Sequence, residues 1–279
     1  MKSILITGNS GYIGSHLTKL LNKSDEYLLY GLDLKEPTIP VYKFFNADIT
    51  DPVDLFDIEF DCVIHLAALV SVSDSITNPE GYYKINTTGT VNVLRYIKTK
   101  HFIHASTGAA ADLKSPYGIS KRMAEDITTQ YCTENNIPFT IFRFYNVIGC
   151  ECVKPTNPDG LFYALLMAPE RGEFTIFGDD YNTIDGTCVR DYTHVNEICH
   201  SIVAILNNPS KKIENLGHGV GTSVQQIVES FKEVNSVDFI VNIGPRRNGD
   251  IEHSVLMNPS RYMKKLYTIE ELLRIPDES

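Results

Sequence analysis

A glycine-rich turn near the N-terminus limits what this chain can fold into more than any other feature. The apolar run Ser3–Thr7 predicts a strand, and glycines follow it at the spacing GxxGxxG as a helical pattern begins. Glycine permits a tight turn and lets the backbone approach a pyrophosphate, which the helix N-terminus would bind. The residues assigned to this phosphate site are Gly8, Gly11, Tyr12, Ile13 and Gly14. The alternative is a glycine turn used only for close packing.

An acidic residue follows the second predicted strand, Tyr27–Leu32. Asp33 lies about 20 residues beyond Gly14, the spacing expected of a carboxylate that binds a ribose. A carboxylate repels a 2′-phosphate, and Lys35 is the only base close to Asp33. The turn and the acid together predict a dinucleotide site that takes NAD rather than NADP.

Short β-type runs alternate with helical spacing through the first half of the chain. The runs that predict strands are Ser3–Thr7, Tyr27–Leu32, Phe44–Phe45, Cys62–His65, Phe102–Ala105 and Phe139–Phe142. Apolar residues at helical spacing lie between them, at Ile13, Leu17, Leu20 and Leu21 and at Val91, Leu94 and Ile97. This alternation predicts an α/β fold: a Rossmann-type, doubly wound parallel sheet with helices on both faces.

The alternation is lost after about residue 148. Stretches rich in Gly and Pro, such as 155–160, 178–186 and 217–221, interrupt the pattern. We therefore expect an NAD-binding domain over residues 1–148 and a smaller C-terminal α/β domain, which binds the substrate, over residues 149–279. Segments near 187–210 are expected to cross back to the first domain.

Composition excludes several classes of partner. The 25 Lys and Arg against 35 Asp and Glu give a net charge of −10, which argues against a general binder of nucleic acid or anionic membranes. No apolar run approaches the roughly 20 residues that span a bilayer, and the N-terminal one is too short for a signal peptide. The six cysteines have no CxxC spacing, so we expect no metal site and a reducing, cytoplasmic location.

A tyrosine and a lysine one helical turn apart form the candidate catalytic pair. The dipeptide Ser115–Pro116 predicts a helix start, which places Tyr117 and Lys121 on one face of the helix. The preceding strand delivers the Thr107 hydroxyl to the sheet edge where doubly wound folds hold ligands. A nearby ammonium would lower the pKa of the phenol, so that Tyr117 acts as acid or base near neutral pH.

Other features have plainer interpretations when taken alone. Tyr96 and Lys100 repeat the Tyr–Lys spacing, but they end the preceding helix at a solvent-facing place, so we interpret them as a chance match. Arg190–Asp191 could be a surface ion pair, and Arg246–Arg247 could be a solvated loop.

Longer strings carry more information than either motif. Thr7–His16 and Tyr117–Lys121 are the first of them. Rarer strings follow in the second half: Ile176–Tyr181, Thr183, Asp185–Thr187, Val189–Tyr192, His194–Val195, Asn215–Gly217, Gly219–Gly221 and Pro245–Asp250. Over nearly its whole length the chain resembles the extended short-chain dehydrogenase/reductase family, and the rarer strings resemble the nucleotide-sugar epimerases within it.

The resemblance implies roles for further residues. It assigns NAD binding, in addition to the phosphate turn, to Asp33, Leu34, Asp48, Ile49, Leu66, Ala67, Ala68, Asn86, Tyr117, Lys121 and Tyr145. It assigns UDP-sugar binding to Asn146, Phe177, Arg190, Tyr192, Arg247, Asp250 and Ser254. Within that set, the two arginines would hold the diphosphate, Phe177 would lie near uracil, and Asp250 would bind the uridine ribose.

The implied activity is the NAD-dependent interconversion of C4 epimers of UDP-hexoses. Tyr117 would remove the proton of the sugar 4-hydroxyl, Thr107 would hydrogen bond to the same oxygen, and Lys121 would bind a ribose and lower the phenol pKa. The 4-keto sugar would turn over while the UDP stays bound, and the hydride would return to its other face. A homodimer, formed by helices about Asn86–Ile97 and Lys121–Asn135, is implied as well.

Departures from the family pattern bear on substrate and activity. Gly108–Ala109 stand where 4,6-dehydratases carry an Asp-Glu pair, the loop from Thr107 to Tyr117 is short, and Val70 stands where a lysine is common. Ser254 aligns with a position beside the sugar 2-substituent, and a small residue there would accept the N-acetyl group of UDP-GlcNAc and UDP-GalNAc. The alternatives are a nucleotide-sugar 4-ketoreductase or dehydratase, and an NAD- or nucleotide-sugar-binding protein with little catalysis.

Overall fold

The computed structural model describes residues 1–53, 55, 57–208, 212–247, 250–264 and 267–275, and the chain forms two compact units. Unit 1 comprises Met1–Phe144 and Cys199–Glu214, and unit 2 comprises Tyr145–Ile198 and Asn215–Ser279. The chain therefore leaves unit 1, returns to it within one helix, α8 (Val195–Leu206), and leaves it again.

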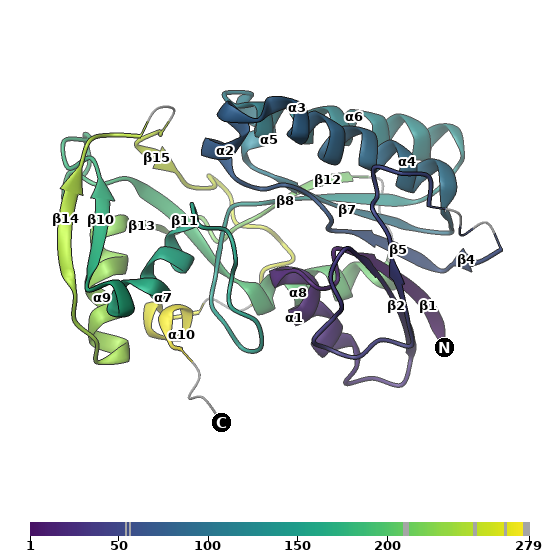
Figure 1. Ribbon diagram of the computed structural model, residues 1–279, viewed down its shortest axis with the longest axis horizontal. Helices are drawn as coiled ribbons and strands as arrows, with labels where there is room; N and C mark the ends of the chain where they lie inside the picture. The colour runs from purple at the N-terminus through teal and green to yellow at the C-terminus, as the bar shows by residue number, and fades with distance from the viewer. Residues whose placement is uncertain (54, 56, 209–211, 248–249, 265–266, 276–279) are drawn as a thin grey trace. The chain divides into compact units, whose positions relative to one another are not determined.

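A seven-stranded sheet forms the centre of unit 1, with the strand order β12-β8-β7-β5-β1-β2-β3 (Figure 1). Its strands are β1 (Lys2–Thr7), β2 (Tyr27–Asp33), β3 (Lys43–Asn46), β5 (Cys62–His65), β7 (Phe102–Thr107), β8 (Phe139–Phe144) and β12 (Lys212–Leu216). The pairs β1–β2, β2–β3, β1–β5, β5–β7 and β7–β8 are parallel. The fold class and the six strands expected from the sequence are confirmed.

The direction of winding reverses between β1 and β5. From β1 the chain adds β2 and β3 on one side, and it then adds β5, β7 and β8 on the other. Doubly wound sheets bind ligands beyond the carboxyl ends of their strands at this switch point. The glycine turn follows β1, so it lies at that point.

Helices cover both faces of the sheet, with α1 and α8 on one face and α2 to α6 on the other (Figure 1). They are α1 (Tyr12–Leu21), α2 (Val72–Thr77), α3 (Pro79–Tyr82), the π-helix η1 (Tyr83–Thr88), α4 (Gly89–Tyr96), α5 (Ala109–Asp112) and α6 (Pro116–Glu134), with the part of α8 after Ile198. Two short strands, β4 (Glu59–Phe60) and β6 (Lys98–Thr99), pair beside them.

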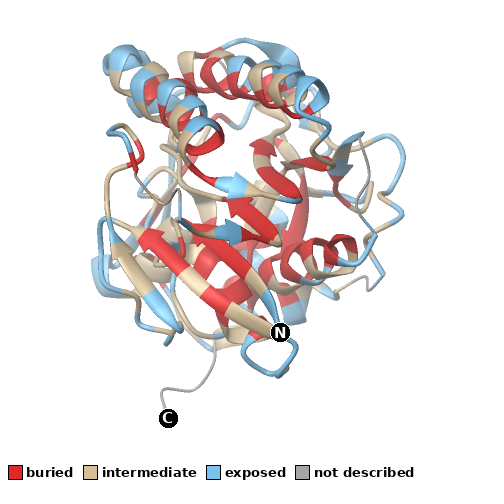
Figure 2. Cartoon of the chain, turned by 90° about the vertical axis from the view of Figure 1, so that its right-hand side faces the viewer, coloured by how far each residue is buried: buried red, intermediate tan, exposed pale blue. Residues whose placement is uncertain are grey.

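The sheet strands are apolar because both faces are covered, as parallel sheets require. Buried residues follow the strands and the inner faces of the helices (Figure 2). Among the exceptions are four polar side chains buried in β1, β5 and β7, namely Thr7, His65, His104 and Ser106. Buried polar groups need hydrogen-bond partners inside the protein, so these four indicate where the sheet does more than pack.

The start of α6 is confirmed in detail. The Ser115 hydroxyl caps the helix by accepting from the Gly118 N–H at 3.1 Å, and Pro116 takes the first helical position.

The end of α4 differs from the sequence expectation. The helix stops at Tyr96, and Ile97 has extended backbone angles. Tyr96 and Lys100 therefore do not share a helix face, and Lys100 instead forms an ion pair with Asp61 at 2.9 Å. Their interpretation as a chance match stands.

Unit 2 is built around a small mixed sheet and a two-stranded one. Its strands are β9 (Asn146–Ile148), β10 (Glu173–Phe177), β11 (Val189–His194), β13 (Gly221–Ser223), β14 (Ile240–Gly244) and β15 (His253–Ser254). Its helices are α7 (Leu161–Arg171), the first turn of α8, α9 (Val224–Asn235) and α10 (Ile269–Leu273). β11 lies between β13 and β15 and also pairs with β9, whereas β10 pairs with β14. Within the described ranges, no helix is long and apolar enough to cross a membrane.

Candidate active site

At two positions of the turn between β1 and α1, only glycine fits. Gly8 has φ +73°, and a Cβ there would lie 2.7 Å from the Ala67 backbone nitrogen. A Cβ on Gly14 would lie 2.2 Å from the carbonyl oxygen of Gly8. The turn therefore packs directly on the residues that follow β5, and α1 begins at its far end with no acidic residue in the first turn. Such a bare helix N-terminus suits a pyrophosphate, so the cradle fits a dinucleotide.

Asp33 is held beside this turn. Its Oδ2 accepts from the Ser10 N–H at 3.1 Å, and its Oδ1 accepts from the N–H groups of Leu34 at 2.7 Å and Lys35 at 3.2 Å. A carboxylate has about four acceptor positions, so it can also accept from a ribose. The Leu34 side chain is 62% exposed next to it.

The segment after β5 is tied to both β1 and α6. The N–H of Leu66 donates to the Thr7 carbonyl at 3.0 Å, and that of Ala67 donates to the Thr7 hydroxyl at 3.3 Å. Asn86, in the π-helix, bonds both the N–H and the carbonyl of Leu69 and also donates to the Ser120 hydroxyl at 3.0 Å. Single π-turns often occur at functional sites, and this one fixes the segment that contains Ala68.

Asp48 and Ile49 follow β3. Asp48 accepts from the Thr50 N–H at 2.8 Å, which shapes the turn. Ile49 is only 5% exposed and packs against Gly89, so its side chain belongs to the core of unit 1. Tyr145 is the first residue of unit 2.

Tyr117 and Lys121 are both buried, with exposed fractions of 9% and 3%. Burial raises the pKa of Tyr117 to about 12, a hydrogen bond with Thr107 acts in the opposite direction, and Tyr82 adds to the rise. The lowered phenol pKa expected from the sequence is therefore wrong for this structure, because burial outweighs the hydrogen bond. Burial lowers the pKa of Lys121 to about 8, against the nearby Glu125 carboxylate, which raises it.

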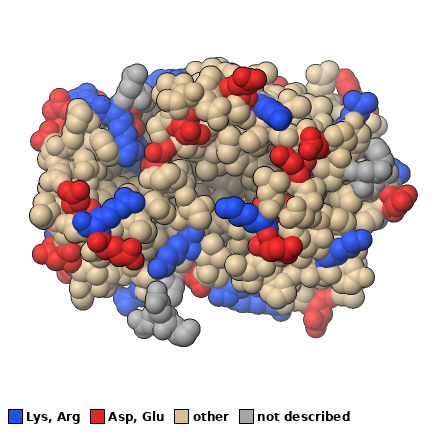
Figure 3. Space-filling model, viewed as in Figure 1, with Lys and Arg blue, Asp and Glu red and all other residues tan. Residues whose placement is uncertain are grey.

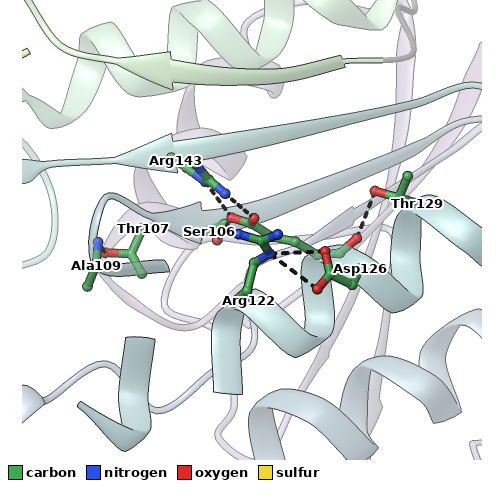
Figure 4. Close-up of polar contacts among 8 residues, drawn as sticks. Ser106, Thr107, Ala109, Arg122, Asp126, Thr129 and Arg143 are labelled. Atoms are coloured by element: carbon green, nitrogen blue, oxygen red, sulfur yellow. Dashed lines mark hydrogen bonds and ion pairs between the residues drawn. The ribbon is translucent and has the colours of Figure 1, made fainter. Parts of the chain in front are cut away.

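A buried ion-pair network lies along α6 beyond Lys121. Glu125 is 0% exposed; it accepts from Arg143 Nε at 2.8 Å and Nη2 at 2.5 Å, and from the Ser106 hydroxyl at 2.5 Å. Figure 4 shows Ser106 on β7 and Arg143 on β8 reaching toward the helix, while the Arg122–Asp126 pair lies on α6 at the surface. The network fixes α6 against two strands of the sheet.

A buried histidine is in contact with Lys121. His104 Nε2 lies 3.3 Å from Lys121 Nζ. Sequence reasoning missed both His104 and Glu125. The available signal was the spacing of Lys121, Glu125 and Thr128 on one face of α6, opposite the alternating His104 and Ser106 of β7.

Arg190, Asp250 and Ser254 come together in unit 2. Ser254 of β15 pairs directly with Arg190 of β11, and Arg190 Nη2 lies 3.6 Å from Asp250 Oδ1. Arg190 Nη1 also donates to the Ile251 carbonyl at 2.8 Å. The guanidinium, with its side chain 13% exposed, is thus fixed by the segment that contains two other predicted substrate residues.

Phe177 and Arg247 form a stacked pair in the same unit. The guanidinium carbon lies 3.9 Å from the centre of the Phe177 ring, and Nη1 reaches toward the Asp159 carbonyl at 3.5 Å. Arg246 stacks likewise over Tyr181 at 4.0 Å and bonds Asp180 at 2.6 Å. Asn248 and Gly249 of this motif lie outside the described residues.

Tyr192, which the resemblance assigns to substrate binding, lies in the core of unit 2. Tyr192 is 5% exposed in the core of unit 2, and among the described residues its buried hydroxyl has no hydrogen-bond partner. The ring packs in the hydrophobic core of unit 2. Asp191, the preceding residue of β11, points the other way and accepts from the N–H groups of His218 and Gly219. Asn146 pairs with Tyr192 across β9 and β11, and its amide donates to the Asp191 carbonyl at 3.3 Å.

Surface charge and metal-ligating residues give no further indication of a site. On the face drawn in Figure 3, Lys and Arg side chains are interspersed with Asp and Glu side chains. Within the part of the chain that the structure describes, no group of three or more His, Cys, Asp or Glu residues could hold a metal ion.

The fold and the site of unit 1 define a Rossmann-type protein of the class that carries a Tyr-x-x-x-Lys pair at the dinucleotide edge of its sheet. The model of the NAD dependent epimerase/dehydratase family matches residues 4–217. The chain belongs to this family.

Three relatives illustrate the similarity. A UDP-glucose 4-epimerase from Lactobacillus helveticus is 32% identical, over 88% of this chain and 86% of its own length. The structure of the UDP-Glc/GlcNAc 4-epimerase from Campylobacter jejuni is 30% identical, with a TM-score of 0.80 over 98% of this chain and 97% of that one. The structure of a UDP-glucose 4-epimerase from Brucella ovis in complex with NAD is 25% identical, with a TM-score of 0.87 over the same shares.

Proposed function

We propose that this protein is an NAD-dependent 4-epimerase of UDP-sugars. The single observation that carries the proposal is the buried Tyr117–Lys121 pair beside Thr107, at the edge of the sheet where the glycine turn lies. The relatives named above, which are all UDP-sugar 4-epimerases, support the same conclusion. Unit 1 then binds NAD through the glycine turn and Asp33, and unit 2 binds the UDP-sugar through Arg190, Arg247 and Asp250.

The residues of unit 1 divide the work of proton transfer. When bound, the nicotinamide reversibly accepts a hydride from the sugar C4. Tyr117 Oη takes the proton of the 4-hydroxyl and later returns it, and the Thr107 hydroxyl donates a hydrogen bond to the same sugar oxygen. Lys121, as an ammonium, binds the ribose hydroxyls and favours the phenolate form of Tyr117. Burial of both side chains keeps water away from them.

The substrate class is a finer part of the proposal. Ser254 lies opposite Arg190 in the strand pair, so its small side chain is close to the arginine that we propose binds the diphosphate. We propose that the enzyme accepts UDP-GlcNAc and UDP-GalNAc as well as UDP-glucose and UDP-galactose. The Campylobacter jejuni relative, described as a UDP-Glc/GlcNAc 4-epimerase, supports this breadth. We also propose that the protein is a homodimer located in the cytoplasm.

The decisive experiment follows the sugar C4 proton by NMR. Purified protein is incubated with NAD and either UDP-galactose or UDP-GalNAc. Conversion of each sugar to an equilibrium mixture of epimers, without net NADH, is the expected result. Stoichiometric use of NADH on a 4-keto sugar would identify a reductase instead, and binding without conversion would identify a binding protein.

The breadth of substrates is tested by Ser254→Tyr. The bulky ring should lower turnover of UDP-GalNAc by about 10-fold to 100-fold relative to UDP-galactose, since a filled pocket discriminates by roughly that much. Ser254→Ala, which keeps the space, is the matched control and should leave the ratio unchanged. An equal effect of Ser254→Tyr on both sugars would contradict the assignment.

A further inference from the structure

His104 lies between Thr128 and Lys121 in the interior of unit 1. It is 0% exposed on β7, its Nδ1 lies 2.9 Å from Thr128 Oγ1, and its Nε2 lies 3.3 Å from Lys121 Nζ. An ammonium can only donate, so Nε2 must be the acceptor and carry no proton. The single ring proton of a neutral imidazole is then on Nδ1, where it is donated to Thr128.

The surroundings keep His104 neutral. Burial holds its pKa well below the usual value, and the nearby Lys121 ammonium lowers it further. His65, on β5, stands edge-on to His104 with ring centres 5.3 Å apart and is bonded at both nitrogens, to Thr7 at 2.7 Å and to Thr90 at 3.0 Å. Neither imidazole is free to shuttle a proton, so His104 is a fixed hydrogen-bond acceptor.

The titratable groups around Lys121 have contacts of their own. Glu125, one turn along α6, is bound by Arg143 of β8 and by the Ser106 hydroxyl. Tyr117, one turn earlier on α6, is in contact with Tyr82 of α3, at 6.1 Å between ring centres. His65 of β5 faces the same region and is neutral, because burial lowers its pKa to about 3. Among the described residues, the hydrogen-bond partner of Lys121 Nζ is therefore the neutral ring of His104.

We propose that His104 is a positioning residue of the active site, which holds the Lys121 ammonium in place through Nε2 while Thr128 fixes the tautomer. The inference rests on the proposed function, because that function gives Lys121 its catalytic role. A neutral acceptor leaves two of the three ammonium protons for the ribose and the phenolate, whereas a carboxylate would compete for them. His104 thus holds the buried Lys121 ammonium without neutralising its charge, and the ammonium remains available to the ribose and the phenolate.

Substitutions at His104 separate its two contacts. His104→Gln carries an amide oxygen near the place of Nε2, His104→Asn reaches only the place of Nδ1, and His104→Phe keeps the ring shape without either nitrogen. A buried ammonium that loses its acceptor is disfavoured, so its pKa falls further and activity is lost at lower pH. We expect Phe and Asn to move the alkaline limb of kcat down by about one pH unit and to lower kcat about 10-fold, and Gln to restore most of both.

Substitutions at Thr128 test which ring nitrogen of His104 carries the proton. Thr128→Val removes the acceptor of the Nδ1 proton, which favours the tautomer with hydrogen on Nε2, facing Lys121. The alkaline limb should then move in the same direction as in His104→Phe, and Thr128→Ser should restore it. Thr129→Val is the matched control on the next residue of α6, because the Thr129 hydroxyl donates to the Glu125 carbonyl, whereas it is Thr128 that lies against the His104 ring.

Two readouts do not depend on epimerase activity. The ¹⁵N shifts of the His104 ring in the full-length protein report the tautomer, and calorimetry against pH reports NAD binding. A protonated Nδ1, with the alkaline limb of NAD binding shifted in His104→Phe and Thr128→Val, supports the inference even where UDP-sugars do not turn over, a result that would refute the proposed function alone. A proton on Nε2 in the wild type, or equal behaviour of the Phe, Asn and Gln variants, overturns it.

Discussion

At the scale of residues, the chemistry of unit 1 depends on how burial changes two pKa values in opposite directions. Burial raises the pKa of Tyr117 to about 12 and lowers that of Lys121 to about 8. Both shifts disfavour the charged form, because a charge loses its hydration inside the protein. Near neutral pH the pair without ligands is therefore a neutral phenol and an ammonium. This state can return a proton to the sugar oxygen, whereas removal of the 4-hydroxyl proton requires the phenolate.

Removal of the Tyr117 hydroxyl should abolish most of the proton transfer without unfolding the protein. Tyr117→Phe is expected to lower kcat by about 10²-fold to 10⁴-fold, the usual contribution of a positioned acid or base. NAD affinity, measured by calorimetry, should stay within a few-fold. Tyr131→Phe, on the same helix, is the control and should retain activity; a similar loss in both variants would point to a structural defect.

The pH profile should show an alkaline limb from Lys121. The ammonium is present below its pKa of about 8 and is lost above it, so kcat/KM should fall as the pH rises through that value. Arginine stays charged throughout this range, so the limb should be absent from whatever activity Lys121→Arg retains. Persistence of the limb in that variant would assign it to another group.

The glycine turn gives a prediction about the cofactor. Gly14→Ala should lower NAD affinity at least about 10-fold and destabilise the protein by roughly 1–3 kcal/mol, since its Cβ would lie 2.2 Å from the Gly8 carbonyl oxygen. Gly172→Ala, in unit 2, meets nothing within 4 Å and suffers only its φ of +74°. That control should cost about 1–2 kcal/mol and leave NAD affinity unchanged.

At the scale of elements, regular periodicity made the sheet and most helices predictable. Strand-forming runs such as Cys62–His65 are apolar because they are buried on both faces, and this leaves a clear pattern in the sequence. The end of α4 was misjudged because Ile97 continues the helical spacing while its backbone is already extended. The contacts of His104, Glu125 and Arg143 join three elements, and the periodicity of one element shows which residues share a face but not which residues of another element they pair with.

The buried network on α6 should dominate the stability of that helix. Glu125→Gln leaves Arg143 without its carboxylate, and breaking a buried pair on one side costs about 3–5 kcal/mol. The loss should appear as a lower urea midpoint. Arg122→Ala breaks the exposed Arg122–Asp126 pair on the same helix and should cost at most about 0.5 kcal/mol. Comparable losses in both variants would mean that Glu125 is no more important than a surface residue.

At the scale of the whole molecule, the proposed homodimer depends on the outer faces of α4 and α6. Val91 of α4 is 36% exposed and Met123 of α6 is 43% exposed, so both helices present apolar side chains away from the sheet. Light scattering should give the mass of a dimer for the wild type. Met123→Arg should shift the protein toward the monomer, because it buries a charge in the interface, and a monomeric wild type would contradict the proposal.

Unit 1 is made of two separate segments of the chain, and this has a consequence for folding during synthesis on the ribosome. The sheet is completed only by β12, which lies next to β8 but follows it by about 70 residues in the chain. At translation rates of roughly 5–20 residues per second, the edge of β8 waits several seconds for its neighbour. An open strand edge invites pairing with other nascent chains. Faster elongation, or a chaperone that shields this edge during the interval, should therefore raise the yield of correctly folded protein.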